Sequence, residues 1–331
     1  MKVFEVTPSN AQHQGSREEQ QDAFAFSDPN AANVSHAGFL ALVADGMGGM
    51  SSGREASRAA ARLFLESYAE KEPGEPIFSA LRRSAFRANE AVREIGNGAS
   101  GVGEAGTTLA AAVIHEDALY WLSVGDSRIY LLNAGSIAQL NEEHNLKSRL
   151  LRLARQGLVG ADEAETHPQR EALTSYIGIE DLTEIDMPDD ALRLKGGDQV
   201  ILCSDGLYRA LSEDEIFETA RGAFAADTAS RLVERAVGKG FAHQDNVTVV
   251  TLSVDESGGV KKTLRAGELQ NERDKRACPA KDTVTLKPDK AETAQKKKFP
   301  WRFCLMLAIA AAGAALAVLL PYLKDYFGGG N

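Results

Sequence analysis

Acidic side chains recur at the ends of short apolar segments of this chain. Each segment has the length and composition of a buried β-strand. One aspartate borders each of them: Asp22, Asp45, Asp126, Asp205 and Asp245. A single aspartate at a strand end is usually a turn former or a helix cap. If the strands are neighbours, however, their ends converge, and five carboxylates brought together without cations would repel one another.

A cluster of divalent cations would remove this repulsion. Oxygen ligands, without cysteine or suitably spaced histidine, suit hard ions such as Mg²⁺ and Mn²⁺. The stretch "DGMGGM" fits this hypothesis, because Gly46 can offer its carbonyl oxygen while Gly48 and Gly49 keep side chains away from an ion and its waters. The alternative interpretation is a tight turn before a helix capped by Ser51 or Ser52, and it is compatible with a metal site.

The chemistry that such a site favours is phosphoryl transfer. A pair of divalent ions bridged by water supplies a nucleophile at neutral pH and clamps the attacking and leaving oxygens. The remaining phosphate oxygens need another cation. Arg17 lies five residues before Asp22, and a guanidinium grips phosphate in a bidentate manner. Spacing alone does not distinguish Arg17 from an ordinary surface arginine.

Charge is distributed unevenly along the 331 residues, whose formal net charge is −10. Residues 1–255 carry a net charge of −16 and residues 256–331 a net charge of +6. An acidic body argues against nucleic-acid binding as the main function. The three cysteines share no ligand spacing, so the sequence predicts neither a disulfide framework nor a zinc site.

The acidic body, residues 1–255, has the pattern of a mixed α and β domain. Strands are expected at 22–26, 38–44, 199–204 and 246–254, and several consecutive hairpin strands at 107–140. Helices are expected at 54–71, 76–96 and 146–157, with an irregular stretch from there to Thr174. The strands cluster instead of alternating with helices, which favours an α+β fold over a doubly wound parallel sheet.

The C-terminal part predicts a membrane anchor. Residues 303–323 are 21 uncharged, mostly apolar residues, which is long enough to cross a bilayer. We therefore expect a basic, disordered linker at 256–300, a transmembrane helix at 301–323 and a short tail at 324–331. Three lysines and an arginine precede the apolar run while one lysine follows it, so the positive-inside rule places the body in the cytoplasm.

Taken in order, the motifs resemble those of the metal-dependent protein phosphatases of the protein phosphatase 2C type, in their bacterial form. The segments that carry the resemblance are "SREEQQDAF", "ADGMGGMSSGREAS", "AGTTLAAAVI", "LSVGDSRIYLL", "HNLKSRLLRLARQG", "THPQREALTSYIG", "GDQVILCSDGLYRAL" and "DNVTVVTL". They extend from Ser16 to about Leu252, essentially the whole body. Any one of them is a weak signal, but eight in the family's order are a strong one.

The resemblance implies an α-β-β-α sandwich, that is, two stacked antiparallel sheets flanked by helices. It implies hydrolysis of phosphoserine and phosphothreonine by a water that bridges metals, with two or three Mn²⁺ or Mg²⁺ ions and no phosphoenzyme. Asp45 matches the acid that bridges two metals and Gly46 the carbonyl ligand. The remaining roles match in this way: Asp205 and Asp245 as ligands of the second metal, Asp126 as ligand of a third, Asp22 as the acid that holds metal-bound water, and Arg17 as the phosphate-binding arginine.

The resemblance also has consequences beyond the site. Residues from about His144 to Leu173 match a variable flap beside the active site that affects substrate choice. Met47 stands where animal members have a histidine proposed as general acid, so a water would have to protonate the leaving group. We expect an enzyme on the inner membrane of a bacterium that opposes a Ser/Thr protein kinase.

Two alternatives remain at this point. The first is a catalytically silent module of the same fold that binds a phosphoprotein at the membrane, although inactive relatives usually lack one or more of the acids. The second is a phosphatase with an aspartyl nucleophile. That class needs a D-x-D pair after a strand, and Asp45 is followed by Gly-Met.

Overall fold

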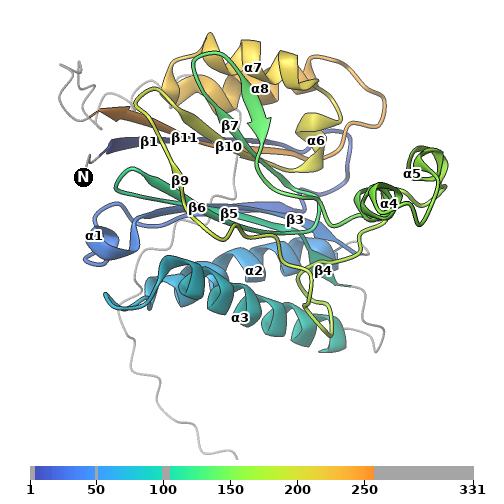
Figure 1. The fold of residues 1–331 in the computed structure, drawn as a ribbon, viewed down its shortest axis with the longest axis horizontal. Helices are drawn as coiled ribbons and strands as arrows, with labels where there is room; N and C mark the ends of the chain where they lie inside the picture. Colours follow the sequence, from blue (N-terminus) through green and yellow to red (C-terminus); the bar gives the residue numbers. More distant parts are fainter. Residues whose placement is uncertain (1–3, 49–50, 99–104, 257–331) are drawn as a thin grey trace, which may run out of the picture. The chain divides into compact units, whose positions relative to one another are not determined.

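The computed structural model describes residues 4–48, 51–98 and 105–256 (Figure 1). The predicted linker (except Glu256), transmembrane helix and tail lie outside the described residues. Within those residues, no helix combines the length and hydropathy that crossing a bilayer requires.

Two antiparallel sheets stack face to face in the described part of the chain (Figure 1). The strand order of the first sheet is β2 (Asp22–Phe26), β3 (Phe39–Met47), β5 (Leu109–His115), β6 (Ala118–Val124) and β9 (Leu192–Arg193), and β4 (Gly106–Thr107) pairs with β3. The order of the second sheet is β1 (Phe4–His13), β11 (Val247–Glu256), β10 (Gln199–Cys203), β7 (Arg128–Leu132) and β8 (Ile137–Gln139).

Side-chain alternation along β3 shows how the layers form. Ala41 and Val43 belong to the apolar cluster that also contains Val250 and Leu252 of the other sheet. Leu40 and Leu42 belong instead to the cluster shared with the helices. Since successive residues of a strand point to opposite faces, a strand buried on both faces needs a continuous apolar run. The segment "FLALVA" is such a run.

Helices cover the outer face of each sheet (Figure 1). The pair α2 (Ser51–Ala69) and α3 (Ile77–Gly98) buries an apolar stripe against the first sheet: Ala56, Ala60, Phe64, Leu81, Ala85 and Val92. The pair α7 (Glu213–Arg221) and α8 (Thr228–Val237) covers the second sheet with Ile216, Ala220, Leu232, Val233 and Ala236. The predicted α-β-β-α arrangement of the body is therefore confirmed.

The remaining helices are short: α1 (Val34–Ala37), α4 (Leu146–Arg155), α5 (Ala161–Thr166), α6 (Asp205–Tyr208) and the 3₁₀ turn η1 (Ala225–Asp227). Helix α4 was expected, whereas α5 lies in the stretch predicted to be irregular. Sequence patterns also missed β1, α7 and α8. Strand β1 is an edge strand that includes Pro8 and is largely solvent-accessible, so it lacks the apolar alternation that reveals a strand.

Candidate active site

A cavity of about 330 Å³ collects most of the predicted site residues. Six of them line it: Arg17, Asp45, Gly46, Asp126, Asp205 and Asp245. They come from five separate parts of the chain, at the ends of β3, β6 and β10 and in the loops before β2 and β11. The prediction that these strand ends converge is thus confirmed for four of the five aspartates.

The backbone of Asp45 is fixed by two hydrogen bonds to Thr108. Its N–H donates to Oγ1 of Thr108 at 2.9 Å, and its carbonyl accepts from the N–H of Thr108 at 2.9 Å. Beyond Asp45, Gly46 and Met47 continue β3 and pair with β4. The expectation that the strand stops at Asp45 was therefore wrong. The continuation fixes the carboxylate on a hydrogen-bonded strand, where its position is better defined than in a loop.

Gly46 is a glycine because of close backbone packing. A Cβ at this position would lie 2.1 Å from the carbonyl oxygen of Gly53 in α2 and 2.6 Å from that of Gln21. Gly48 is exposed and has a φ of +139°, a conformation that side chains other than glycine rarely adopt. The glycines thus bring α2 and the loop before β2 against the end of β3.

Two aspartates stand on the side of the second sheet, each with an arginine partner. Asp205 begins α6 directly after β10, and the Nε of Arg209 lies 3.0 Å from its Oδ2. Asp245 precedes β11, and Nη2 of Arg17 donates to its Oδ2 at 2.7 Å. The two acids are brought together at a tight contact, since a Cβ on Gly206 would lie 2.0 Å from the carbonyl oxygen of Asn246.

Asp126 lies in the turn between β6 and β7 and is 7% exposed. The hydroxyl of Tyr208 donates to its carbonyl at 3.1 Å. The preceding Gly125 donates its N–H to Nδ1 of His144 at 3.1 Å and accepts from the N–H of His144 at 2.8 Å. The turn that carries Asp126 is therefore tied to α6 and to the first residue of the flap.

Asp22 is placed differently from the other four acids. It is opposite Asp45 in the β2–β3 register but 4% exposed, and it is not among the residues that line the cavity. Its Oδ2 accepts from Oγ of Ser204 at 2.8 Å and from Oγ1 of Thr248 at 2.6 Å, while its Oδ1 has no hydrogen-bond partner among the described residues. Burial raises the pKa of Asp22 to about 7.

The carboxylates destabilise one another's charged forms. Burial, followed by the charges of Asp22, Asp205, Asp126 and Asp245, raises the pKa of Asp45 well above its ordinary value. Burial and then the charge of Asp205 raise the pKa of Asp126 to about 7. Burial also raises the pKa of Asp205, although Arg209 opposes the shift. This mutual repulsion is the electrostatic signature of a site built to receive cations.

The donor set fits Mg²⁺ or Mn²⁺. Four carboxylates and a backbone carbonyl are all hard oxygen ligands. Among the described residues, no three His, Cys, Asp or Glu side chains stand close enough together to hold one ion. Magnesium-type ions need few protein ligands, because they keep several of their waters. The arrangement thus suits ions that are held by one or two carboxylates each.

Several residues of the site escaped sequence reasoning. Arg209 lines the cavity and reaches Asp205; its spacing of four residues from that aspartate on a helix is the signal that could have revealed it. Asn246 shapes the loop around Arg17: its Nδ2 donates to the carbonyls of Gln14 and Glu19 at 2.8 Å and 3.0 Å, and its Oδ1 accepts from the N–H of Gln21 at 2.7 Å. No local pattern identifies such a long-range contact.

Comparison with known proteins agrees with this arrangement. The family profile described as "Protein phosphatase 2C" matches residues 10–244. A serine/threonine phosphatase of Listeria monocytogenes is 30% identical over 220 residues, which cover 65% of this chain and 84% of that protein.

Solved structures share the fold. The serine/threonine phosphatase of S. agalactiae superposes with a TM-score of 0.66 at 28% identity, covering 76% of this chain and all of that one. The catalytic domain of the phosphatase PstP in complex with two manganese ions has a TM-score of 0.60 at 26% identity, covering 77% of this chain and 100% of that one.

The stacked sheets and the cavity lined by carboxylates are those of a metal-dependent phosphatase. The chain belongs to the protein phosphatase 2C family. The prediction of an enzyme in the class of serine/threonine protein phosphatases is thereby confirmed.

Proposed function

We propose that this protein hydrolyses phosphoserine and phosphothreonine in proteins, with Mn²⁺ or Mg²⁺ held by Asp45, Gly46, Asp126, Asp205 and Asp245. The proposal rests on one observation: four carboxylates line the same cavity as Arg17, whose guanidinium is a group that can bind phosphate. When bound, the divalent ions would supply an activated water and neutralise charge on the phosphate oxygens.

The chain's own residues would bind and orient the substrate. The ion pair with Asp245 uses one of the two terminal nitrogens of Arg17, so other N–H groups of this largely exposed guanidinium can receive phosphate oxygens. Asp22 does not line the cavity but stands opposite Asp45 in the β2–β3 register, and its unpaired Oδ1 would accept a hydrogen bond from a water that lies beside Asp45. Met47 lines the cavity but cannot donate a proton, so the leaving alkoxide would take its proton from water.

The proposed cellular setting rests on the sequence. We infer a transmembrane helix at 301–323 that holds the body, residues 1–255, at the cytoplasmic face of a bacterial inner membrane, with residues 256–300 as linker. The substrates would be proteins phosphorylated by a Ser/Thr kinase. The apolar run of 21 residues and its basic N-terminal flank support this proposal.

A catalytically silent phosphoprotein-binding module is the competing function. Loss of one or more acids would favour it, but all of the acids are present, and four of them line the same cavity as Arg17. We therefore favour catalysis.

The decisive experiment is phosphate release from a phosphothreonine peptide by the purified full-length chain, with Mn²⁺, with Mg²⁺ and with EDTA. Asp45→Asn is expected to reduce turnover by at least about 10³-fold. Asp190→Asn, at an exposed aspartate away from the cavity, is the matched control and should behave like wild type. A folded wild-type protein without turnover under any metal would refute the proposal in favour of the binding module.

The membrane proposal has its own test. Full-length protein expressed in bacteria should stay in the membrane fraction through a carbonate wash, while residues 1–300 should be released. Retention of the truncated protein would show that 301–323 is not the anchor.

A further inference from the structure

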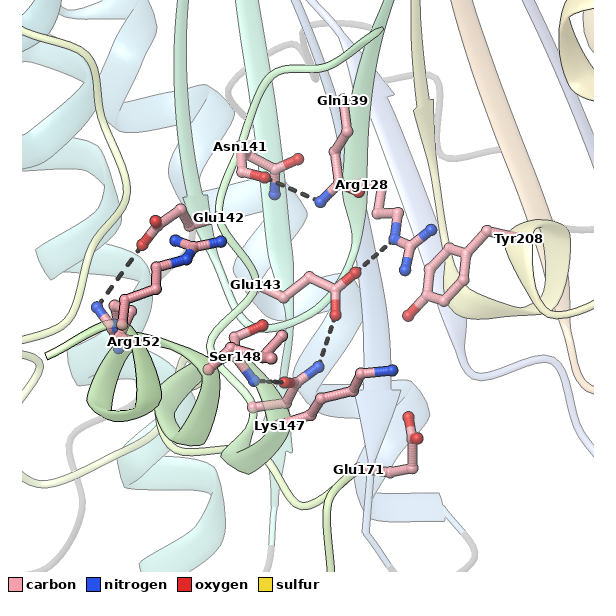
Figure 2. A pocket seen from close by; sticks show the side chains of 13 residues that line it. Arg128, Gln139, Asn141, Glu142, Glu143, Lys147, Ser148, Arg152, Glu171 and Tyr208 are labelled. Carbon is pink, nitrogen blue, oxygen red and sulfur yellow. Dashed lines mark hydrogen bonds and ion pairs between the residues drawn. The ribbon is translucent and has the colours of Figure 1, made fainter. Parts of the chain in front are cut away.

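A second cavity, of about 370 Å³, lies between the flap (residues 144–173) and the body (Figure 2). Its walls come from β7, β8, the segment 141–145, helix α4 and Tyr208 of α6. Glu171 of the flap also lines it. Glu171 and Tyr208 are both neighbours of Arg209, the arginine that pairs with Asp205. This second cavity shares no lining residue with the cavity that the acids line, so its polar wall needs another explanation.

Arg128 is the centre of that wall. It is the first residue of β7, two residues after Asp126, and its side chain is 22% exposed. Its Nε donates to Oε1 of Glu143 at 2.5 Å, and its Nη1 donates to the hydroxyl of Tyr130 at 2.9 Å. Its guanidinium lies 3.7 Å from the ring centroid of Tyr208 (Figure 2). One side chain thus contacts its own strand, the segment 141–145 and α6.

On the flap side, the contacts continue to the start of α4. The second oxygen of Glu143 accepts from Nδ2 of Asn145 at 2.6 Å. Asn145 is 2% exposed, and its Oδ1 accepts from the N–H of Ser148 at 2.9 Å, which caps the N-terminus of α4. The amide of Asn145 therefore uses one end for the glutamate and the other for the helix.

On the catalytic side, the contacts continue through Tyr208. Its hydroxyl donates to the carbonyl of Asp126 at 3.1 Å. Tyr208 ends α6, the helix that begins with Asp205. The guanidinium of Arg128 stacked on this ring consequently connects two acids of the active site with the cap of the flap helix.

The other ion pairs between the body and α4 are longer and more exposed to solvent. Arg152 lies 3.6 Å from Glu142 and 3.9 Å from Glu184, and these side chains are exposed by 34–58%. Exposed pairs at such distances contribute little, whereas a largely buried, charge-assisted pair has a fixed geometry. Two hydrogen bonds between His144 and Gly125, one of them to the imidazole, hold the base of the flap but do not reach its helix.

We propose that Arg128, Glu143, Asn145 and Tyr208 form a relay that sets the position of the flap relative to the metal-binding acids, and that Arg128 and Glu143 are positioning residues for large substrates. The proposal rests on the proposed phosphatase function. A phosphoprotein extends beyond the cavity that holds its phosphate and contacts the flap, whereas a small phosphate ester does not. The relay should therefore affect protein substrates selectively.

Glu143→Gln in the full-length chain breaks the relay with little change of shape. Glutamine can accept from Arg128, but its amide NH₂ then faces the NH₂ of Asn145. Turning the amide of Asn145 would restore that bond and give up the cap of α4. Glu142→Gln is the matched control, because it is the same substitution at the adjacent, exposed glutamate. Arg128→Lys keeps the charge and loses the planar stacking and the directed Nε bond.

Two readouts distinguish positioning from a general structural effect. With Mn²⁺ present, Glu143→Gln and Arg128→Lys should lower kcat/KM for a phosphothreonine protein by about tenfold or more and change it by less than about twofold for p-nitrophenyl phosphate. Trypsin should also cleave α4, which contains Lys147, Arg149, Arg152 and Arg155, several-fold faster in both variants than in wild type or Glu142→Gln.

Equal losses on both substrates would overturn the proposal, because the side chains would then act on the metal centre or on folding. Unchanged tryptic cleavage in Glu143→Gln would overturn it as well. If wild type hydrolyses neither substrate, the proposed function fails, while the cleavage rates still test the relay independently.

Discussion

The edge that carries the acids and the flap are held in place by different kinds of interaction. Asp45 sits on a strand paired on both sides, and Asp205 and Asp245 adjoin β10 and β11, which pair with each other. Helix α4 of the flap depends on a cap, a buried relay and exposed ion pairs. Backbone pairing thus fixes the acids that we propose to hold metal ions, while a few side chains hold the helix of the flap. If both proposals are right, chemistry and substrate choice can vary separately.

The largest expected difference between the two regions is the loss of stability when a glycine is replaced by alanine. Gly46→Ala would place a Cβ 2.1 Å from one carbonyl oxygen and 2.6 Å from another, and neither backbone segment can move without disturbing β3 or α2. We expect a loss of more than about 3 kcal/mol in the free energy of unfolding. Gly160→Ala in the flap meets open space at a φ of −70°, so it should change stability by no more than about 1 kcal/mol.

Urea denaturation followed by circular dichroism measures both variants. A Gly46→Ala protein as stable as Gly160→Ala would mean that the end of β3 is as adaptable as the flap, and the contrast between the two regions would be lost.

Arg17→Lys tests whether the edge that carries the acids needs the planar shape of a guanidinium or only its charge. Lysine keeps the charge beside Asp245 but cannot present a planar fork to phosphate. We expect kcat/KM for p-nitrophenyl phosphate to fall by about 10- to 100-fold, the loss of one bidentate charge-assisted contact. The same substitution at the exposed Arg93 of α3 is the control. Activity retained within twofold would assign the phosphate-binding role to another cation, and Arg209 would be the next candidate.

The edge that carries the acids should also respond to pH. Burial raises the pKa of Asp22 and of Asp126 to about 7 in the folded chain, above their ordinary value of 3.8 in the unfolded chain. The folded state then binds more protons between those values, so metal-free protein loses stability as pH rises from about 4 to 7. We expect Tm at pH 5.5 to exceed Tm at pH 7.5 by about 2–4 °C or more.

Calorimetry of the EDTA-treated protein checks this, with Asp22→Asn as the variant that should flatten the dependence. Adding Mn²⁺ at pH 7.5 should raise Tm, because bound cations favour the ionised carboxylates. A Tm that rises with pH in the metal-free protein would contradict the assignment of raised pKa values to these acids.

The same contrast explains how far the sequence could predict the molecule. Apolar runs such as "FLALVA" and "QVILCS" encode buried strands with acids at their ends, so the α+β class was predictable from the residues, and so was the convergence of Asp45, Asp126, Asp205 and Asp245 once the strands are neighbours. The arrangement in layers was implied by the family resemblance. The position of Asp22 behind the cavity was not, because it depends on hydroxyls 182 and 226 residues away.

The flap was harder to predict. The helix at 146–157 is visible in its basic and apolar periodicity, but α5 is a single short, acidic segment without an apolar stripe. The relay that holds α4 joins Arg128, Glu143 and Tyr208, which have no shared motif. Side-chain contacts between separate elements leave no periodic signal in a sequence.

The smallest predicted effect concerns an exposed charge pair of the flap. Nζ of Lys147 in α4 lies 2.9 Å from Oε2 of Glu165 in α5, and the two side chains are 35% and 61% exposed. Solvent screening should limit the contribution of this pair to less than about 0.5 kcal/mol. A double-mutant cycle of Lys147→Met and Glu165→Gln, measured by urea denaturation, isolates the coupling energy. A coupling above about 1 kcal/mol would mean that exposed charges hold the flap together, and the buried relay through Glu143 would lose its distinctive role.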